Sequence, residues 1–382
     1  GFEENNVPSA MSDAGFRGED MGLPLNQKTI ANYLQAQNYR CMVLGKWHLG
    51  GADRFHPLKR GFDEFYGLRG GSRRYFAYKP GQRVDPLNWM ERDFEGYGEH
   101  EGYLTDALGD EACAFMERNR EEPFFVYLSF NAVHTPMEVR NEDLKPFSKL
   151  NKPRQKQAAM MLAMDRACGK VLAKLESLGL ADNTLVVFTN DNGGDVNNAS
   201  INAPLSGVKA THLEGGIRVP FLIKWSGMLK AGSTYARPIS LLDLLPTFVD
   251  AAGGDPAALH GIDGVSLLPY LKGVRTDRPH QTLYWKKETR AAVRDGEDGT
   301  LTSSTNQSRL LWLLQFLQPA QLLSPAPRPP HTPALSRRHH GRAAVPERRA
   351  RRALHSLLQR FRHSIGYPGR RARLLARHRS GT

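Results

Sequence analysis

The sequence is poor in cysteine and contains no long apolar run. Its three cysteines, Cys41, Cys113 and Cys168, lie far apart, and none belongs to a CxxC pair. This spacing argues against a disulfide-stabilised scaffold and against a zinc site. The apolar stretch "LLWLLQFL" at 310–317 is far shorter than the roughly 20 residues that a transmembrane helix needs. We therefore expect no membrane span.

Lysine and acidic residues are almost missing from the last part of the chain. Residues 301–382 contain 16 arginines, no lysine and one acidic residue, Glu347, whereas the first 300 residues carry 36 basic and 38 acidic residues. One interpretation of this tail is a disordered basic segment that binds nucleic acid. The other is an aberrant sequence translated out of frame. The abrupt loss of lysine favours the second, so we expect no nucleic-acid partner.

The part of the chain before the tail alternates amphipathic segments with short apolar runs. Helices are predicted at 28–39, 104–119, 154–180 and 240–254, and strands at 41–44, 123–130, 183–190 and 219–225. Continuous apolar strands are typical of sheets buried on both faces, and helices between strands indicate crossover connections. The sequence therefore predicts an α/β fold in which helices sandwich a mostly parallel sheet.

Three of the predicted strands are followed directly by chemically active side chains. Lys46 and His48 follow the first, His134 follows the second, and Asp191 and Asn192 follow the third. Alone, each has an ordinary interpretation: Asp-Asn-Gly-Gly is a good turn sequence, and the basic residues suit any surface. Ligands of open α/β sheets bind at the carboxyl ends of the strands. The convergence of three strand ends therefore favours a functional site.

A fourth loop adds a further cation. Lys209 lies in "KATHLEGGIRVPFLIKW" (209–225), which leads into the fourth strand. A lysine ammonium is a compact point charge that suits an oxyanion, although Glu214 and Arg218 could simply pair there and the glycines could only form a bend. The neighbouring carboxylate and amide oxygens of Asp191 and Asn192 suit a hard cation such as calcium.

Seven stretches occur together in an order that resembles the type I sulfatases of the alkaline phosphatase superfamily. They are "GKWHLG" (45–50), "RGFDEFYG" (60–67), "HTP" (134–136), "FTNDNGG" (188–194), the 209–225 stretch, "DLLPTFVDAAG" (243–253) and "IDGVSLLPYLKG" (262–273). The resemblance extends over roughly residues 27–296 and is specific as an ordered set. It implies hydrolysis of a sulfate ester, which we expect to belong to a sulfated carbohydrate or a sulfated small molecule.

The resemblance implies a role for each basic residue. Lys46 would contact the sulfate and the catalytic aldehyde hydrate, and His48 would hydrogen-bond that hydrate. His134 would lie near the leaving-group oxygen as a candidate acid, and Lys209 would bind sulfate oxygens. The four would be catalytic, and Lys46, His134 and Lys209 would also bind substrate. A sulfate ester needs its charge neutralised and its leaving alkoxide protonated, which agrees with these residue types.

The resemblance also implies a calcium ion and a modified nucleophile. Asp191 and Asn192 would supply half of the calcium site. The family's nucleophile is a formylglycine, made by a formylglycine-generating enzyme within a C-x-P-S-R motif or a similar one. In "NVPSAM" (6–11) no cysteine precedes the Pro-Ser pair and no arginine follows Ser9. We therefore expect that this sequence lacks the N-terminal segment that contains the motif. Without that segment, the chain should not hydrolyse sulfate esters.

The resemblance further divides the chain and suggests a compartment. Residues 1–280 would form the catalytic α/β domain without its N-terminal part, and 281–296 would start a small C-terminal α+β subdomain. The Arg/Pro-rich tail would occupy 297–382. The family resemblance implies a secreted or periplasmic protein, although no signal segment is visible in this sequence.

Two other functions remain open. A phosphoester hydrolase of the same superfamily would use two transition metals held by additional His and Asp ligands, and "DNGG" has no such histidine nearby. An inactive protein that binds sulfated glycans would keep Lys46 and Lys209 and lack the nucleophile.

Overall fold

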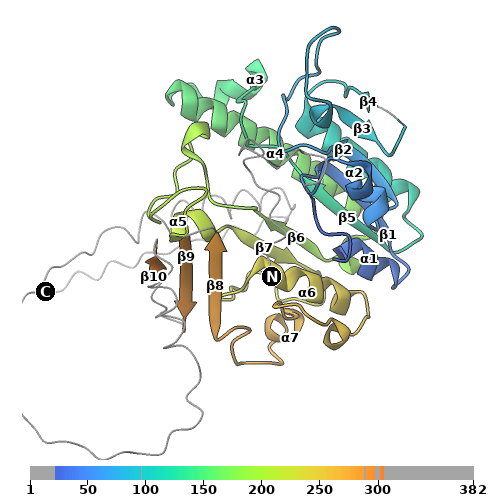
Figure 1. Ribbon diagram of the computed structural model, residues 1–382, viewed down its shortest axis with the longest axis vertical. Helices are drawn as coiled ribbons and strands as arrows, with labels where there is room; N and C mark the ends of the chain where they lie inside the picture. Colours follow the sequence, from blue (N-terminus) through green and yellow to red (C-terminus); the bar gives the residue numbers. More distant parts are fainter. Residues whose placement is uncertain (1–21, 96, 288–289, 297–301, 305–382) are drawn as a thin grey trace, which may run out of the picture. The chain divides into compact units, whose positions relative to one another are not determined.

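The computed structural model describes residues 22–95, 97–287, 290–296 and 302–304 (Figure 1). They all belong to one compact unit. The predicted tail at 297–382 therefore lies outside the described residues, apart from 302–304.

The central element is a five-stranded sheet with the order β4-β3-β2-β1-β5. Its strands are β1 (Arg40–Lys46), β2 (Glu64–Leu68), β3 (Met90–Arg92), β4 (Tyr97–Gly98) and β5 (Phe124–Ser129). β1 is parallel to both β2 and β5, whereas β3 and β4 add antiparallel pairs at one edge. β1 therefore lies between two parallel neighbours, and its burial pattern shows five consecutive buried residues.

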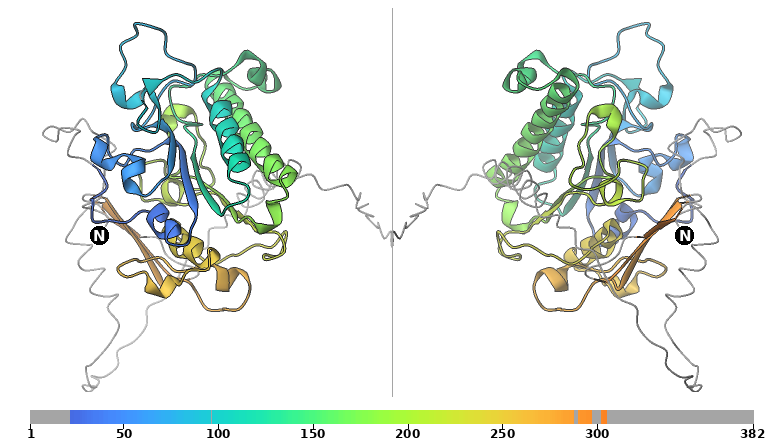
Figure 2. Two further views of the ribbon diagram at one scale, coloured as in Figure 1. Left: turned by 90° about the vertical axis from the view of Figure 1, so that its right-hand side faces the viewer. Right: turned by 90° about the vertical axis from the view of Figure 1, so that its left-hand side faces the viewer.

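Helices cover both faces of this sheet, as the apolar runs predict. Alternate residues of β1 face opposite sides: Met42 and Leu44 belong to the cluster that contains residues of α2 (Leu104–Arg118) and α4 (Lys152–Ser177). Cys41 and Val43 instead pack with α1 (Ile30–Gln35), against which α6 (Leu244–Ala251) lies. Figure 2 shows α2 and α4 side by side along one face. The predicted α/β fold class is confirmed.

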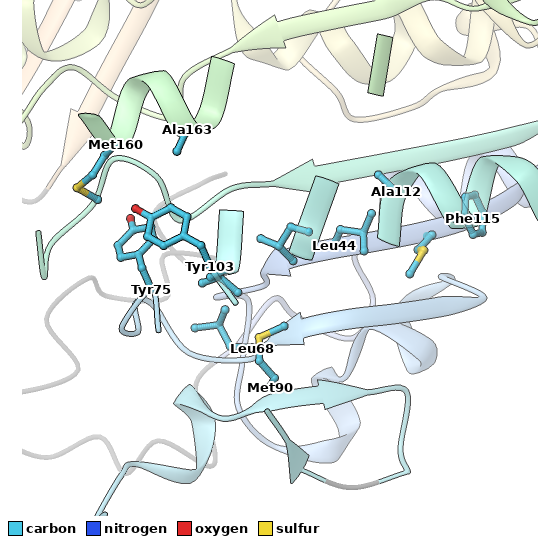
Figure 3. Close-up of a cluster of buried hydrophobic side chains, with 12 residues drawn as sticks. Leu44, Leu68, Tyr75, Met90, Tyr103, Ala112, Phe115, Met160 and Ala163 are labelled. Atoms are coloured by element: carbon cyan, nitrogen blue, oxygen red, sulfur yellow. The ribbon is translucent and has the colours of Figure 1, made fainter. Parts of the chain in front are cut away.

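The larger core lies between the sheet and the α2–α4 pair (Figure 3). Leu44, Leu68, Leu104 and Phe115 have no exposed surface there, and complete burial of one such side chain contributes about 1.5–3 kcal/mol. Tyr75 and Tyr103 stack at one end of this cluster with ring centroids 5.5 Å apart. This end of the core lies beneath the segment that carries His134, which makes it part of the support of the site.

The third and fourth predicted strands pair with each other in a separate ladder. β6 (Val186–Thr189) and β7 (Phe221–Lys224) form a two-stranded antiparallel sheet. The connection at 190–220 returns the chain to the end at which β6 stops, so β7 runs in the reverse direction. An apolar run predicts a buried strand but contains no information on its direction, which is why the sequence alone placed both in the parallel sheet.

The remaining elements are short. α3 (Asn141–Leu144), α5 (Glu214–Ile217) and α7 (Leu268–Leu271) are single-turn helices. β8 (Thr282–Lys287), β9 (Arg290–Asp295) and β10 (Thr302–Ser304) form an antiparallel sheet in the order β10-β9-β8, where the sequence predicts the start of a small subdomain. In the part of the chain that the structure describes, no helix has the length and apolar character needed to span a bilayer.

Candidate active site

The end of β1 places Lys46 and His48 beside a buried tryptophan. The β1–β2 pairing continues past the strand, because the Trp47 N–H donates to the Leu68 carbonyl (2.9 Å) and the His48 N–H to the Arg69 carbonyl (3.1 Å). The Trp47 indole is 5 % exposed, and its Nε1–H donates to the Phe55 carbonyl at 2.9 Å. Trp47 therefore anchors the segment, while the residues on either side of it are half-buried.

Glycine is required immediately before Lys46. Gly45 has φ +88°, and a Cβ atom there would lie 2.0 Å from the Ser129 carbonyl oxygen of β5. Only glycine combines this backbone conformation with so close an approach of two strands. His48 itself adopts φ 55°, a conformation that costs a non-glycine residue roughly 1–2 kcal/mol. Such an outlier is typical of a functional position that its surroundings enforce.

His134 follows β5 in a turn whose backbone is held from below. The His134 N–H donates to the Asn131 carbonyl (2.7 Å). The fully buried Tyr75 donates its hydroxyl to the Asn131 carbonyl (2.6 Å) and also lies 3.0 Å from the His134 carbonyl. The backbone of this turn is therefore held from the core by Tyr75.

The ring of His134 is oriented by two neighbours. Nδ1 lies 2.7 Å from the Thr135 carbonyl, which can only accept, so Nδ1 carries the hydrogen. Nε2 then presents its lone pair to the ammonium of Lys209, whose Nζ lies 3.4 Å away. The two basic residues, 75 positions apart in the sequence, thus meet through this contact.

Lys209 is positioned by hydrogen bonds between loops and not by a strand. Its N–H donates to the Gly194 carbonyl (3.1 Å). The side chain of Asn202 accepts from the Gly194 N–H (2.9 Å) and donates to the carbonyls of Gly194 (2.9 Å) and Gly207 (3.2 Å). Asn202 therefore joins the loop after β6 to the loop that bears Lys209.

The electrostatics of the site favour an anion. Burial lowers the pKa of His48 to about 4, with further lowering from Lys46, Lys209 and His134, and Asp191 opposes the shift. Burial also lowers the pKa of Lys46, Lys209 adds to the effect, and Asp191 again opposes it. The structure thus brings the four predicted basic residues and Asp191 within electrostatic reach of one another. The centre of the site therefore holds two lysines and two histidines.

The predicted calcium ligands form an incomplete site. Asp191 is exposed, and its Oδ1 accepts the N–H of Asn192 at 2.9 Å. Calcium takes six to eight oxygen ligands. Among the described residues there is no group of three or more His, Cys, Asp or Glu side chains that could hold a metal ion. Two oxygen donors are too few to complete a calcium site.

None of the three cysteines has the setting of a nucleophile. Burial raises the pKa of Cys41 to about 12, and Asp63 raises it further. Burial also raises the pKa of Cys168 to about 12 and that of Cys113 above its ordinary value. A thiolate is the reactive form, so these side chains are inert packing residues.

Sequence analysis missed the residues that hold the loops in place. Tyr75, Asn198 and Asn202 bind backbone carbonyls of the loops that bear the basic groups. Their residue types are common in turns and cores and signal no chemistry. The two asparagines lie within a dozen residues of "DNGG", which is the one local signal that could have drawn attention to them.

Known proteins are similar to this chain over most of its length. A family model described as Sulfatase matches residues 1–254. N-acetylgalactosamine-6-sulfatase of Homo sapiens is 34% identical over 293 residues, which cover 72% of this chain and 54% of that protein. Steryl-sulfatase of Mus musculus is 30% identical over 345 residues, which cover 70% of this chain and 54% of that protein. The chain spans about half the length of these curated relatives.

A solved structure shares both the fold and the sequence pattern. The crystal structure of Ps i-CgsB in complex with k-i-k-neocarrahexaose is 33% identical, with a TM-score of 0.68, and covers 78% of this chain and 74% of that one. The family model extends over well more than half of the chain, and the basic residues brought together here belong to stretches that resemble type I sulfatases. The chain belongs to the sulfatase family of the alkaline phosphatase superfamily.

Proposed function

We propose that the site binds the sulfate group of a sulfated carbohydrate and serves the hydrolysis of its sulfate ester. The observation that carries this proposal is the contact of Lys209 Nζ with the lone pair of His134 Nε2 at 3.4 Å. Around it, burial lowers the pKa of His48 to about 4, with further lowering from the charges of Lys46 and Lys209, so its imidazole is neutral at neutral pH. A sulfate placed among these groups would be neutralised by two cations and would meet two imidazoles.

The basic residues divide the work of binding and proton transfer. Lys46 and Lys209 act on the sulfate oxygens, because each is a point charge on a flexible stem. If the sulfate ester accepts the hydrogen bonds of Lys209, the contact between Lys209 Nζ and His134 Nε2 is lost. His134 Nε2 is then free to interact with the leaving oxygen. An anion beside the imidazole also favours its protonated form. His134 is therefore the candidate acid, and His48 is a neutral hydrogen-bonding group beside Lys46.

In this proposal, the residues described above supply neither the nucleophile nor a complete set of calcium ligands. The family resemblance implies a formylglycine, made by a formylglycine-generating enzyme, and none of the three inert cysteines fits that role. Asp191 and Asn192 contribute two oxygens to a calcium site and hold the ion weakly by themselves. Removal of the nucleophile from a preorganised site leaves only a small residual acceleration. A protein with this sequence alone is therefore expected to bind inorganic sulfate and to hydrolyse almost no sulfate ester.

Family membership also supports a proposed location. We assign the protein to the periplasm or the extracellular space, as the resemblance to type I sulfatases implies. Export of the chain fused to a reporter that is active only outside the cytoplasm tests this assignment. No reporter activity from a fusion to the natural full-length gene would contradict it.

Binding of inorganic sulfate and of N-acetylgalactosamine 6-sulfate by titration calorimetry tests the proposed site. We expect Lys46→Met and Lys209→Met each to weaken binding by about tenfold, which corresponds to about 1.4 kcal/mol. The exposed Lys230 provides the matched control, because Lys230→Met removes the same charge at a distance in sequence from the site. Equal effects of all three substitutions would contradict the proposal.

Two further measurements separate the alternatives. A phosphoester hydrolase would bind inorganic phosphate or a sugar phosphate more tightly than the sulfate compound. An inactive glycan-binding protein would bind the sulfated sugar, and no sulfate release would follow even with calcium and a formylglycine-bearing segment supplied. Sulfate release under those conditions supports the enzyme.

A further inference from the structure

We propose that Asn198 is a positioning residue that fixes His134 against Lys209 and couples it to the loop that bears Asp191. The proposal rests on the function proposed above. Asn198 closes a 3-10 turn at Val196–Asn198 and is 8 % exposed. Its Nδ2 donates to the carbonyl of Val133 at 2.9 Å. Val133 directly precedes His134, so this bond acts on the backbone one residue from the reacting ring.

The side chain of Asn198 is itself held firmly. Its Oδ1 accepts from the N–H of Ser200 (3.2 Å) and from the Ser200 hydroxyl (2.6 Å). The Ser200 Oγ in turn accepts from Nε2 of Gln157 (2.9 Å), which is a buried residue of α4. A carbonyl can only accept, so the amide orientation follows from the Val133 bond. A chain of hydrogen bonds therefore extends from α4 to the turn of His134.

The backbone of the His134 turn accepts hydrogen bonds from two sides. Tyr75 binds the carbonyls of Asn131 and His134 from the core, and Asn198 binds that of Val133 from the loop after β6. At 3.4 Å, the contact between His134 Nε2 and Lys209 Nζ is already long for a hydrogen bond. A displacement of the turn by about 1 Å would break it, and displacements of this size have large effects in active sites.

The same loop carries Asp191 at its start and Asn198 near its end. Asn202, a few residues further on, joins this loop to the Lys209 loop through the Gly194 and Gly207 carbonyls. The three loops that bear His134, Asp191 and Lys209 are thus connected by two asparagine side chains. Asn198 is the member of this pair that reaches His134.

The experiment compares Asn198→Ala with Asn197→Ala. Asn197 is the exposed neighbour in the same 3-10 turn, so its substitution changes the same residue type without the Val133 bond. Ser200→Ala is a milder variant that removes the hydroxyl between Gln157 and Asn198 and keeps the Val133 bond and the Ser200 N–H bond to Asn198. The readouts are the ring ¹⁵N resonances of His134, which report the tautomer and its hydrogen bonds, and the dissociation constant of inorganic sulfate.

We expect Asn198→Ala to shift the His134 Nε2 resonance and to weaken sulfate binding about fivefold. Ser200→Ala should change both in the same direction by less, and Asn197→Ala should stay within about twofold of the wild type. A merely structural role would lower the melting temperature and leave the ring resonances unchanged. Unchanged ring resonances in folded Asn198→Ala, or in Ser200→Ala if the former does not fold, would overturn the proposal.

The ring resonances keep this test separate from that of the proposed function. If the wild-type protein binds no sulfate, the proposed function fails, and the His134 resonances still decide whether Asn198 positions the ring. If sulfate binds and Asn198→Ala alters neither readout, the positioning role fails and the binding site stands.

Discussion

The two halves of the site are held in place by different means. Lys46 and His48 lie at the end of β1, a strand with five consecutive buried residues and a parallel partner on each side. Asp191 and Lys209 lie on loops attached to β6 and β7, whose residues are all only partly buried. The first half is therefore positioned by strand register and core packing. The second is positioned by a few hydrogen bonds from asparagine side chains.

Because of this difference, substitutions in the two halves should have different effects. A buried strand between two neighbours transmits any steric change to the whole sheet, since interiors are close-packed. A loop held by side-chain hydrogen bonds can open locally without global unfolding. We therefore expect substitutions in the β1 half to act on global stability, and substitutions in the β6–β7 half to act on local order and on ligand binding.

The largest expected effect is that of Gly45→Ala. The new Cβ would meet the Ser129 carbonyl at 2.0 Å in a backbone with φ +88°, which should lower the free energy of unfolding by about 3 kcal/mol. Chemical denaturation measures it. Gly98, where a Cβ would meet nothing within 4 Å, is the control, and Gly98→Ala should change stability by less than about 0.5 kcal/mol. Similar values for the two variants would contradict the assignment of the β1 half to strand packing.

Asn202→Ala should have an intermediate effect confined to the other half. The substitution leaves the Gly194 N–H and the Gly194 and Gly207 carbonyls without their side-chain partner, at a cost of about 1–3 kcal/mol. Hydrogen exchange should accelerate in residues 191–216 and remain unchanged in β1. Asn197→Ala serves as the control. Faster exchange in β1 as well would show that the two halves form one cooperative unit.

Lys46→Met should test the electrostatics within the β1 half, and Lys209→Met the electrostatic link between the halves. Burial is the main reason for the low pKa of His48, and the charge of Lys46 is the next. Removing that charge should raise the pKa of His48 from about 4 toward its ordinary value, without reaching it, because the imidazole stays buried. Titration of the His48 ring by NMR measures the change. A Lys209→Met variant should act in the same direction by less, and no shift in either would refute the cationic centre.

The smallest expected effect is a contribution of His48 to acid sensitivity. The native pKa of about 4 lies below the ordinary histidine value of 6.5, so the unfolded chain binds a proton in this window that the native protein does not. Stability from this group is fully present above about pH 6.5 and is lost as the pH falls toward 4. His48→Gln should therefore flatten the pH dependence of the melting temperature between pH 6.5 and 4. An unchanged slope would show that His48 is not buried in its neutral form.

Much of the fold was predictable because it depends on local periodicity. The predicted helix at 104–119 and α2 (Leu104–Arg118) agree to within one residue, since its apolar residues recur at helical spacing. The predicted helix at 28–39 is longer than α1 (Ile30–Gln35), because the chain leaves the helix at Ala36 and Asn38 adopts φ 62°. The antiparallel direction of β7 was not predictable, because a short apolar strand looks the same in either direction.

The basic residues of the site were found for a topological reason. Lys46, His48 and His134 follow apolar runs directly, and the carboxyl ends of parallel strands such as β1 and β5 meet at one edge. Tyr75, Asn198 and Asn202 gave no such signal. Tyr75 and Asn198 act on backbone carbonyls 56 to 65 positions away, and pairings of that range are set by the fold alone.

The sequence by itself determined the α/β class, the buried β1, and the placement of a lysine and a histidine on either side of an anchoring tryptophan. These follow from residue type and spacing, which act within one or two neighbouring elements. Only the tertiary structure decided that His134 Nε2 lies 3.4 Å from Lys209 Nζ and that His48 has a pKa of about 4. The contact joins segments 75 positions apart, and the pKa depends on burial and on charges from distant segments, because the free energy of an ionised group is set by its surroundings in space.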